Sequence, residues 1–366
     1  MSTLIFVVVI VALIIVHEFG HFVVAKLSGM RVDEFGLGYP PHALTITTVG
    51  ETAYTLNWLP FGGFVKIYGE DALSPDAAKD PRAFSSKPRF AQALVLVAGI
   101  TMNLLFAYVL ITGALVAGTP RALDESELTT AYGLELMVAD VLPNAPASLT
   151  GLLAGDSIVS AKDAKRVWQA TDPKSFSAFV ASSEGREISL TIKRNGSEQI
   201  MVATPRKGIA TTDPSRLALG VEIATIGVVP LSLGSALTEG VVLTWSATKM
   251  TAVGLGKFFY SIFTLSADLS QVAGPIGIAG AVGSASSQGF GNLLSIMAII
   301  SINLALINLI PIPALDGGRL LFVIIESIIR RPIKANIANS INMVGFAFLV
   351  LLMVVVTAHD IFKIVG

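Results

Sequence analysis

His17, Glu18 and His21 form an H-E-x-x-H pattern near the start of the chain. On a helix, residues four positions apart lie on one face, so both imidazoles can bind one cation while Glu18 reaches towards a water on that cation. The sequence has 4 His and no Cys, which excludes thiolate zinc sites, iron–sulfur clusters and disulfides. The pattern therefore predicts one catalytic zinc ion, with His17 and His21 as ligands and Glu18 as general base.

Asp316 is the best candidate for the third zinc ligand. A catalytic zinc ion takes three protein ligands and leaves one position for water. Asp316 directly follows the uncharged stretch 269–315, whereas His42 falls in a loop and His359 lies at the far end of the last apolar segment. A carboxylate placed at the end of such a stretch requires a compensating partner, and a metal ion is one.

The segment around Asp316 also predicts a broken helix. Pro311 and Pro313 remove two backbone donors, a break tolerated at membrane depth only where the backbone lines a protein interior or a water-filled cavity. Gly317 and Gly318 then predict a tight turn. We expect this segment to bring Asp316 towards the histidines.

The composition indicates a membrane protein. Of 366 residues, 53% are hydrophobic and 14% are charged, against roughly a quarter charged in soluble domains. The net charge of −1 gives no field for nucleic acid, so no nucleic-acid partner is expected. About four segments are long and uncharged enough to cross a bilayer, the first interrupted only by the H-E-x-x-H residues. They are 3–25, 90–120, about 292–315 and 335–357.

The basic residues predict an orientation. Lys and Arg concentrate between the first and second apolar segments and between the third and fourth, which puts both termini outside the cell and these loops in the cytoplasm. The first segment has no Lys or Arg before it and no small-residue cleavage site after it, so we expect a retained helix rather than a signal peptide. Segment 237–265 carries Glu239, Lys249 and Lys257 and is expected to lie at the outer interface.

The middle of the chain has a different composition. Alternating apolar residues, turn residues and ordinary charge density predict an inserted β-rich domain over 118–215, with a helix near 174–183. Regions 1–117 and 216–366 then hold the membrane helices. Two predicted membrane crossings separate the N-terminus from the insert, so the insert is expected on the same side as the N-terminus, outside the cell.

Alternating residues over 54–68 predict a β-hairpin with its turn near residues 60–63. The edge strand of this hairpin would bind an extended segment of a substrate chain by β-augmentation, with Gly62 and Gly63 as substrate-binding residues. A hairpin that only seals the rim of a cavity is the alternative.

These motifs together resemble the site-2 protease family of intramembrane zinc metalloproteases, and most of all its bacterial regulator-of-sigma-E protease group. The resemblance rests on His17-Glu18-x-x-His21, on N-x-x-P-x-P-x-L-D-G from Asn308 to Gly317, and on the insert between the second and third helices. It implies a polytopic α-helical membrane protein with a membrane-associated β-hairpin. It also implies that His17, His21 and Asp316 bind zinc, that Glu18 is the general base and that Asn308 contacts the substrate backbone.

The same resemblance implies regulated intramembrane proteolysis of single-span substrates, such as anti-sigma factors or signal-peptide remnants, in the bacterial inner membrane. The run from Val141 to Ile158 resembles a single PDZ domain, and Gly133-Leu134 looks like a loop that captures a peptide carboxylate. A peptide C-terminus is thus a possible partner, beside transmembrane substrates and the lipid bilayer. A β domain that only shields the membrane region is the alternative.

Two rival functions remain open at this point. A secondary transporter or ion pathway also places ionisable residues and broken helices near the midplane, but the two motif-bearing segments show no repeat. An inactive membrane scaffold that presents a PDZ module would not require Glu18.

Overall fold

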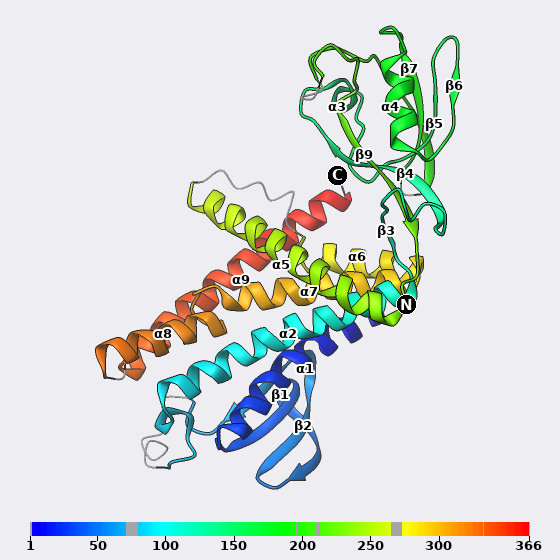
Figure 1. Cartoon of the computed structure of the whole chain (residues 1–366). Helices are drawn as coiled ribbons and strands as arrows, with labels where there is room; N and C mark the ends of the chain where they lie inside the picture. The colour runs from blue at the N-terminus through cyan, green and yellow to red at the C-terminus, as the bar shows by residue number, and fades with distance from the viewer. Residues whose placement is uncertain are drawn as a thin grey trace. The chain divides into compact units, whose positions relative to one another are not determined.

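The computed structural model describes residues 2–70, 80–194, 196–209, 213–264, 273–331 and 333–365. The chain divides into two compact units. One is helical and combines Met1–Ala117 with Ser232–Gly366, and the other is the insert Gly118–Leu231. Both are drawn in Figure 1.

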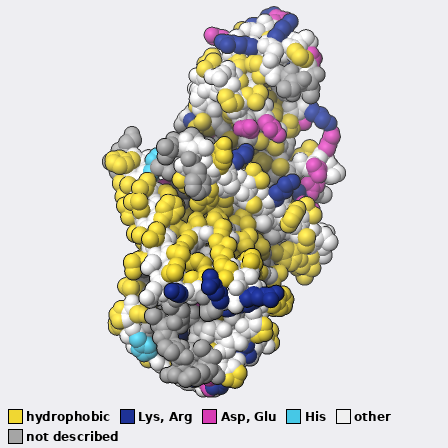
Figure 2. Space-filling view, turned by 90° about the vertical axis from the view of Figure 1, so that its left-hand side faces the viewer, with side chains coloured by type: hydrophobic (Ala, Val, Ile, Leu, Met, Phe, Trp, Pro, Cys, Tyr) yellow, Lys and Arg dark blue, Asp and Glu magenta, His cyan; other side chains and the backbone are white. Residues whose placement is uncertain are grey.

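Within the described residues, four helices are long and apolar enough to cross a membrane: α1 (Ser2–Leu27), α2 (Arg89–Ala117), α7 (Phe290–Leu309) and α9 (Ala335–Val365). They confirm the four predicted spans. The third ends at Leu309 rather than near residue 315, because Pro311 and Pro313 interrupt it. Figure 2 shows the outcome on one face, a broad band of hydrophobic side chains bordered on one side by a row of Lys and Arg.

Further helices pack around the spans. They are a 3-10 turn η2 (Phe84–Ser86), α5 (Leu233–Phe263), α6 (Pro275–Gln288) and α8 (Asp316–Ile329). Segment 237–265 is thus helical as far as Phe263, and α5 packs on α2, where the hydroxyl of Tyr108 donates to the carbonyl of Leu237. Helix α5, which carries Glu239, Lys249 and Lys257, is not among the candidate spans of the described residues.

The hairpin consists of β1 (Val32–Val49) and β2 (Thr52–Ile67). Its turn lies at Gly50–Glu51, so the predicted turn near residues 60–63 is wrong. Gly50 has a positive φ of 63°, which suits a tight reversal. Leu37 of β1 pairs with both Leu56 and Gly63 of β2, so β2 changes from one side of β1 to the other between these residues.

Small residues bring α1 and α2 together. A Cβ at Gly20 of α1 would lie 2.5 Å from the carbonyl oxygen of Ala98 on α2, so only glycine allows this approach. Leu13 of α1 and Ala107 of α2 are fully buried in a cluster with Ile302 of α7. These contacts fix the inner face of α1 against α2.

The insert is a mixed unit around one sheet with strand order β3-β9-β4-β5-β7-β8, in which β6 pairs with β5. Leu136, Phe176 and Leu190 lie in its core. The strands and helices, in chain order, are β3 (Pro120–Ala122), β4 (Tyr132–Val141), α3 (Pro146–Leu149), β5 (Ser157–Lys162), β6 (Val167–Trp168), α4 (Pro173–Ala181), β7 (Ile188–Arg194), β8 (Ser197–Ala203) and β9 (Val221–Val228).

The predicted β-rich character and the predicted helix, seen as α4, are confirmed. The compact unit extends to Leu231, past the predicted end of the insert at residue 215, because β9 lies between β3 and β4 in the sheet and pairs with both. Gly133 and Leu134 also differ from the prediction, since they lie inside β4 at an irregularity in its pairing with β9 and not in a loop before the strand.

Candidate metal centre

His17 and His21 face α2 from one side of α1. The two side chains are one helical turn apart, and each residue is buried, with 8% and 7% of its surface exposed. Nε2 of His21 lies 3.2 Å from Nε2 of His17. The four-residue spacing therefore brings both imidazoles to one point, as the sequence predicted.

Asp316 joins them from the first turn of α8. Its Oδ2 lies 2.9 Å from Nε2 of His17 and 3.3 Å from Nε2 of His21. In a tetrahedral zinc site with ligand bonds of about 2.0–2.1 Å, neighbouring ligand atoms are roughly 3.3 Å apart. Two of the three separations match this spacing and the one between His17 and Asp316 is shorter. Among the described residues the three side chains form the one group of His and carboxylate side chains that could hold a metal.

The broken segment between α7 and α8 places Asp316. Ala314 has a positive φ of 77°, and the backbone N–H of this residue donates to the side chain of Asn342 on α9. Gly317 and Gly318 do not form the predicted tight turn but begin α8. A Cβ on Gly317 would lie 2.4 Å from the carbonyl oxygen of Ile310, so these glycines allow α8 to pack on the loop.

Glu18 lies one residue beyond His17 and is half-buried. A Cβ at Gly63 of β2 would lie 3.6 Å from Cγ of Glu18, so this part of the hairpin lies beside the proposed base. Gly62 has a positive φ of 107° beside it. The structure therefore brings Gly63, one of the two predicted substrate-binding glycines, next to Glu18, and Gly62 precedes it in β2.

Asn308 in the last turn of α7 lies at the same place. Its Nδ2 is 3.4 Å from Nε2 of His17. His42, in contrast, is exposed in β1 and contacts Thr45, and His359 lies near the end of α9. The rejected histidines are thus not in the group.

The sequence analysis missed the residues of α2 that contact the two histidines. Nδ1 of His21 donates to the backbone carbonyl of Val95 at 2.8 Å, and Nδ1 of His17 lies 3.3 Å from the side-chain nitrogen of Asn103. A Cβ at Gly99, midway between them, would lie 2.4 Å from Nε2 of His21. The sequence offered one sign of these contacts, a Gly and an Asn four positions apart in the uncharged stretch 90–120.

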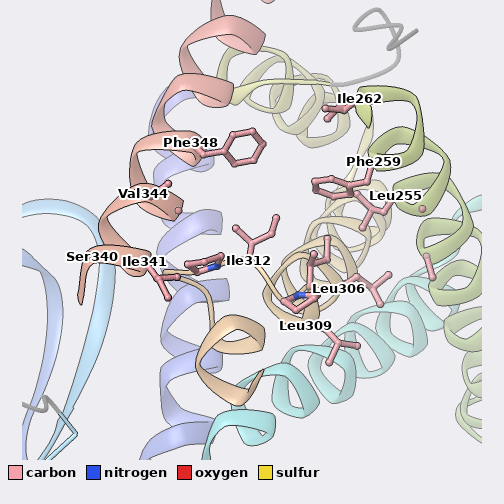
Figure 3. A pocket seen from close by; sticks show the side chains of 16 residues that line it. Leu255, Phe259, Ile262, Leu306, Leu309, Ile312, Ser340, Ile341, Val344 and Phe348 are labelled. Atoms are coloured by element: carbon pink, nitrogen blue, oxygen red, sulfur yellow. The ribbon is translucent and has the colours of Figure 1, made fainter. Parts of the chain in front are cut away.

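An apolar cavity of about 1010 Å³ lies beside the broken segment. Figure 3 shows Phe259 of α5 and Phe348 of α9 facing each other across it, with Ile312 of the broken segment below them in the view. Leu309 and Ile312 line this cavity and also pack against the start of α8. An apolar ligand in the cavity would therefore lie next to the segment that carries Asp316.

Sequence comparison assigns the family. A profile of peptidase family M50 matches residues 5–352. The chain belongs to this family. This match confirms the predicted resemblance to site-2 proteases, which belong to peptidase family M50.

Relatives cover nearly the whole chain. A putative zinc metalloprotease of Clostridium perfringens is 35% identical over 96% of this chain and 95% of its own length. One from Nostoc sp. is 32% identical over 95% of this chain and 93% of its own length. The zinc metalloprotease RasP of Oceanobacillus iheyensis is 29% identical over 95% of this chain and 96% of its own length. With the four apolar helices of its described residues, this M50 member is a multi-pass membrane protein.

Proposed function

We propose that this chain is an intramembrane zinc metalloprotease in which His17, His21 and Asp316 bind one zinc ion and Glu18 is the general base. The observation that carries the proposal is the spacing of the three donor atoms, 2.9, 3.2 and 3.3 Å apart on elements from opposite ends of the chain. A bound zinc ion would activate a water and polarise the substrate carbonyl. The residues His17, Glu18 and His21 alone could not do this, because a catalytic site needs the third ligand.

Glu18 and Asn308 have separate roles in this proposal. Glu18, on the same turn as His17, takes a proton from the attacking water and returns it to the leaving amine. The side chain of Asn308, beside His17, donates to a carbonyl of the substrate backbone. A transporter would use these ionisable groups without a hydrolytic water, and cleavage of peptide bonds distinguishes the two functions.

The substrate would enter as an apolar membrane segment that unwinds beside β2. The stretch 63–67 of β2 pairs with β1 on one side, and the described residues show no strand on its other side. That free edge, next to Glu18, can pair with an extended backbone by β-augmentation. The still helical part of the substrate would be apolar and would suit the cavity between α5 and α9. Single-span proteins, including anti-sigma factors and signal-peptide remnants, have such segments.

The proposed location is the bacterial inner membrane, with both termini and the insert outside. The support is the distribution of Lys and Arg between the apolar segments and the basic row at one border of the apolar band in Figure 2. His17 lies about 14 Å along α1 from Lys26, given a rise of 1.5 Å per residue. The metal centre would therefore lie in the cytoplasmic half of the bilayer.

For the insert we propose a PDZ-like role in binding a peptide C-terminus. A cavity of about 350 Å³ lies between α4 and the start of β9, where Ser177 and Val180 face Gly220 and Val221. Residues 221–224 of β9 pair with β4 alone among the described strands, so their other edge can accept an extended peptide. Arg216 at the cavity would attract the terminal carboxylate.

The zinc assignment is tested by metal analysis of the purified full-length chain in detergent. Asp316→Asn keeps the size of the side chain and removes its charge, so we expect zinc to be lost together with cleavage of a single-span substrate. Asp124→Asn, which makes the same change at an exposed carboxylate of the insert, is the control and should retain zinc. Full zinc content in Asp316→Asn would contradict the assignment.

A further inference from the structure

Three residues of α2, spaced by four positions, face the two imidazoles of α1. They are Val95, Gly99 and Asn103. The contact with Val95 determines the tautomer of His21. Nδ1 of His21 lies 2.8 Å from the backbone carbonyl of Val95, and a carbonyl only accepts hydrogen bonds, so Nδ1 carries the proton. Nε2 of His21 therefore keeps its lone pair for a metal ion.

His17 needs a corresponding partner. When its Nε2 binds a metal, its Nδ1 must carry the proton and needs an acceptor. The one side chain within hydrogen-bond distance of this nitrogen, among the described residues, is Asn103 at 3.3 Å. The position of the proton on His17 therefore depends on which amide atom of Asn103 faces the imidazole.

Asn103 has an unused acceptor for this purpose. The residue is 0% exposed, and its Oδ1 has no hydrogen-bond partner in the described part of the chain. A buried carbonyl oxygen without a donor is unfavourable, so it should find one in the working protein. Rotation of the amide by 180° exchanges Nδ2 and Oδ1, and Oδ1 then accepts from Nδ1–H of His17.

We propose that Asn103 is a positioning residue that holds His17 in the tautomer whose Nε2 binds the metal. This inference rests on the proposed zinc site of His17, His21 and Asp316. Val95 and Asn103 then act alike, one on each imidazole, and Gly99 between them provides the space for both rings. The hydrogen-bond partners of Nδ1 in both histidines thus come from one face of α2.

A purely structural role for the Asn103 side chain is less consistent with its contacts. The link between α2 and α7 at this point uses the backbone of Asn103, whose carbonyl accepts from the hydroxyl of Ser301 at 2.8 Å. The side chain is directed instead at His17. Ser301 is as deeply buried as Asn103 and does not contact the imidazoles, so it offers a matched control.

The test is the zinc affinity of the purified full-length protein in detergent, measured by competition with a chromophoric chelator. Asn103→Leu removes the acceptor and keeps the branched shape of the side chain, and we expect zinc to bind about 10- to 100-fold more weakly. Asn103→Asp retains an oxygen acceptor and should bind within a few-fold of wild type, as should Ser301→Ala. The visible spectrum of the cobalt-substituted protein should change in Asn103→Leu and be restored in Asn103→Asp.

Two results would overturn the inference: wild-type zinc affinity in Asn103→Leu, or equal weakening in Asn103→Leu and Asn103→Asp. If Asn103→Leu does not fold, Asn103→Ala, which removes the acceptor without adding volume, replaces it with the same expectation. His17→Ala separates this inference from the proposed function. Tight zinc binding in His17→Ala would refute the zinc site itself, whereas zinc loss there with normal affinity in Asn103→Leu would refute only the role of Asn103.

Discussion

Nε2 of His17 lies 2.9 Å from Oδ2 of Asp316, although 299 positions separate the two residues in the chain. Helix α1 carries the first and helix α8 the second, and α2 packs against both. The metal centre therefore forms only when the helical unit has folded around α2. Substitutions on α2 that leave every proposed ligand in place should still affect zinc.

Gly99→Ala is the sharpest such change. The new Cβ would lie 2.4 Å from Nε2 of His21, which forces the imidazole away or separates α1 from α2. We expect zinc affinity to fall roughly 10- to 100-fold, with loss of cleavage. Gly113→Ala on the same helix is the control, because its nearest neighbour would be a flexible Leu294 side chain at 3.3 Å. Equal effects of the two substitutions would argue against crowding of the metal centre.

Val65→Pro tests the proposed substrate edge of β2. The N–H of Tyr68 donates to the carbonyl of Arg31, next to the start of β1, so by strand alternation the N–H of Val65 points away from β1. Proline at this position removes a main-chain donor from the free edge. We expect cleavage to fall about 5- to 10-fold or more, the value of one or more lost hydrogen bonds, with zinc retained. Thr48→Pro, on an exposed part of β1, controls for general damage to the hairpin. Normal cleavage in a folded Val65→Pro protein would remove the support for β-augmentation here.

Ser177→Trp tests the proposed peptide site of the insert. Ser177 lines the cavity at α4, and a tryptophan there should fill it, whereas Ala178→Trp places the same side chain on the exposed face. We expect Ser177→Trp to weaken binding of a fluorescent peptide with a free C-terminus by roughly tenfold or more, measured by anisotropy. An amidated peptide should bind more weakly than the free acid to the wild type. Unchanged binding in Ser177→Trp would place the peptide elsewhere or exclude it.

Asp163 predicts how the stability of the insert depends on pH. Burial alone would raise the pKa of Asp163, but the backbone N–H of Lys165 and the guanidinium groups of Arg166 and Arg186 outweigh it and hold this pKa well below its usual range. A carboxyl group with a lowered pKa in the folded state stabilises the fold above the pKa of the unfolded chain, about 3.9. This contribution is lost as the pH falls below about 4.

Urea unfolding of the insert, followed by the fluorescence of Trp168, measures this dependence. Trp58 and Trp245 are exposed and can be replaced by Phe to isolate the signal. We expect Asp163→Asn to reduce the loss of stability between pH 5 and pH 3 to a smaller slope. Glu125→Gln, which breaks an exposed ion pair with Lys174, should leave that slope unchanged. A wild-type slope in Asp163→Asn would contradict the assignment.

The sequence predicted the residues whose signal is local. The spacing of His17 and His21 determines a shared helix face, and missing charges mark the spans. The residues it missed depend on contacts between segments: Gly99 and Asn103 lie in a helix that is apolar on every side, so periodicity does not reveal which face meets α1. Gly317 was misassigned for the same reason, because its role is a close approach to Ile310.

The hairpin turn was mispredicted because glycine and proline occur both in turns and at irregular positions within strands. The residues around Gly63 contain turn-forming types, but in the structure β2 crosses there from one side of β1 to the other. The compact unit of the insert extends past residue 215 because β9 lies in the sheet beside β4, a pairing between residues 80 to 96 positions apart that local composition does not show.

The most direct test of the catalytic assignment is cleavage of a single-span substrate by Glu18→Gln, with zinc content measured on the same sample. Gln keeps the shape of the side chain but cannot accept a proton from the attacking water. We predict that the variant retains the zinc content of the wild type and loses cleavage by about 100-fold or more. Full cleavage by Glu18→Gln would contradict the proposed protease mechanism.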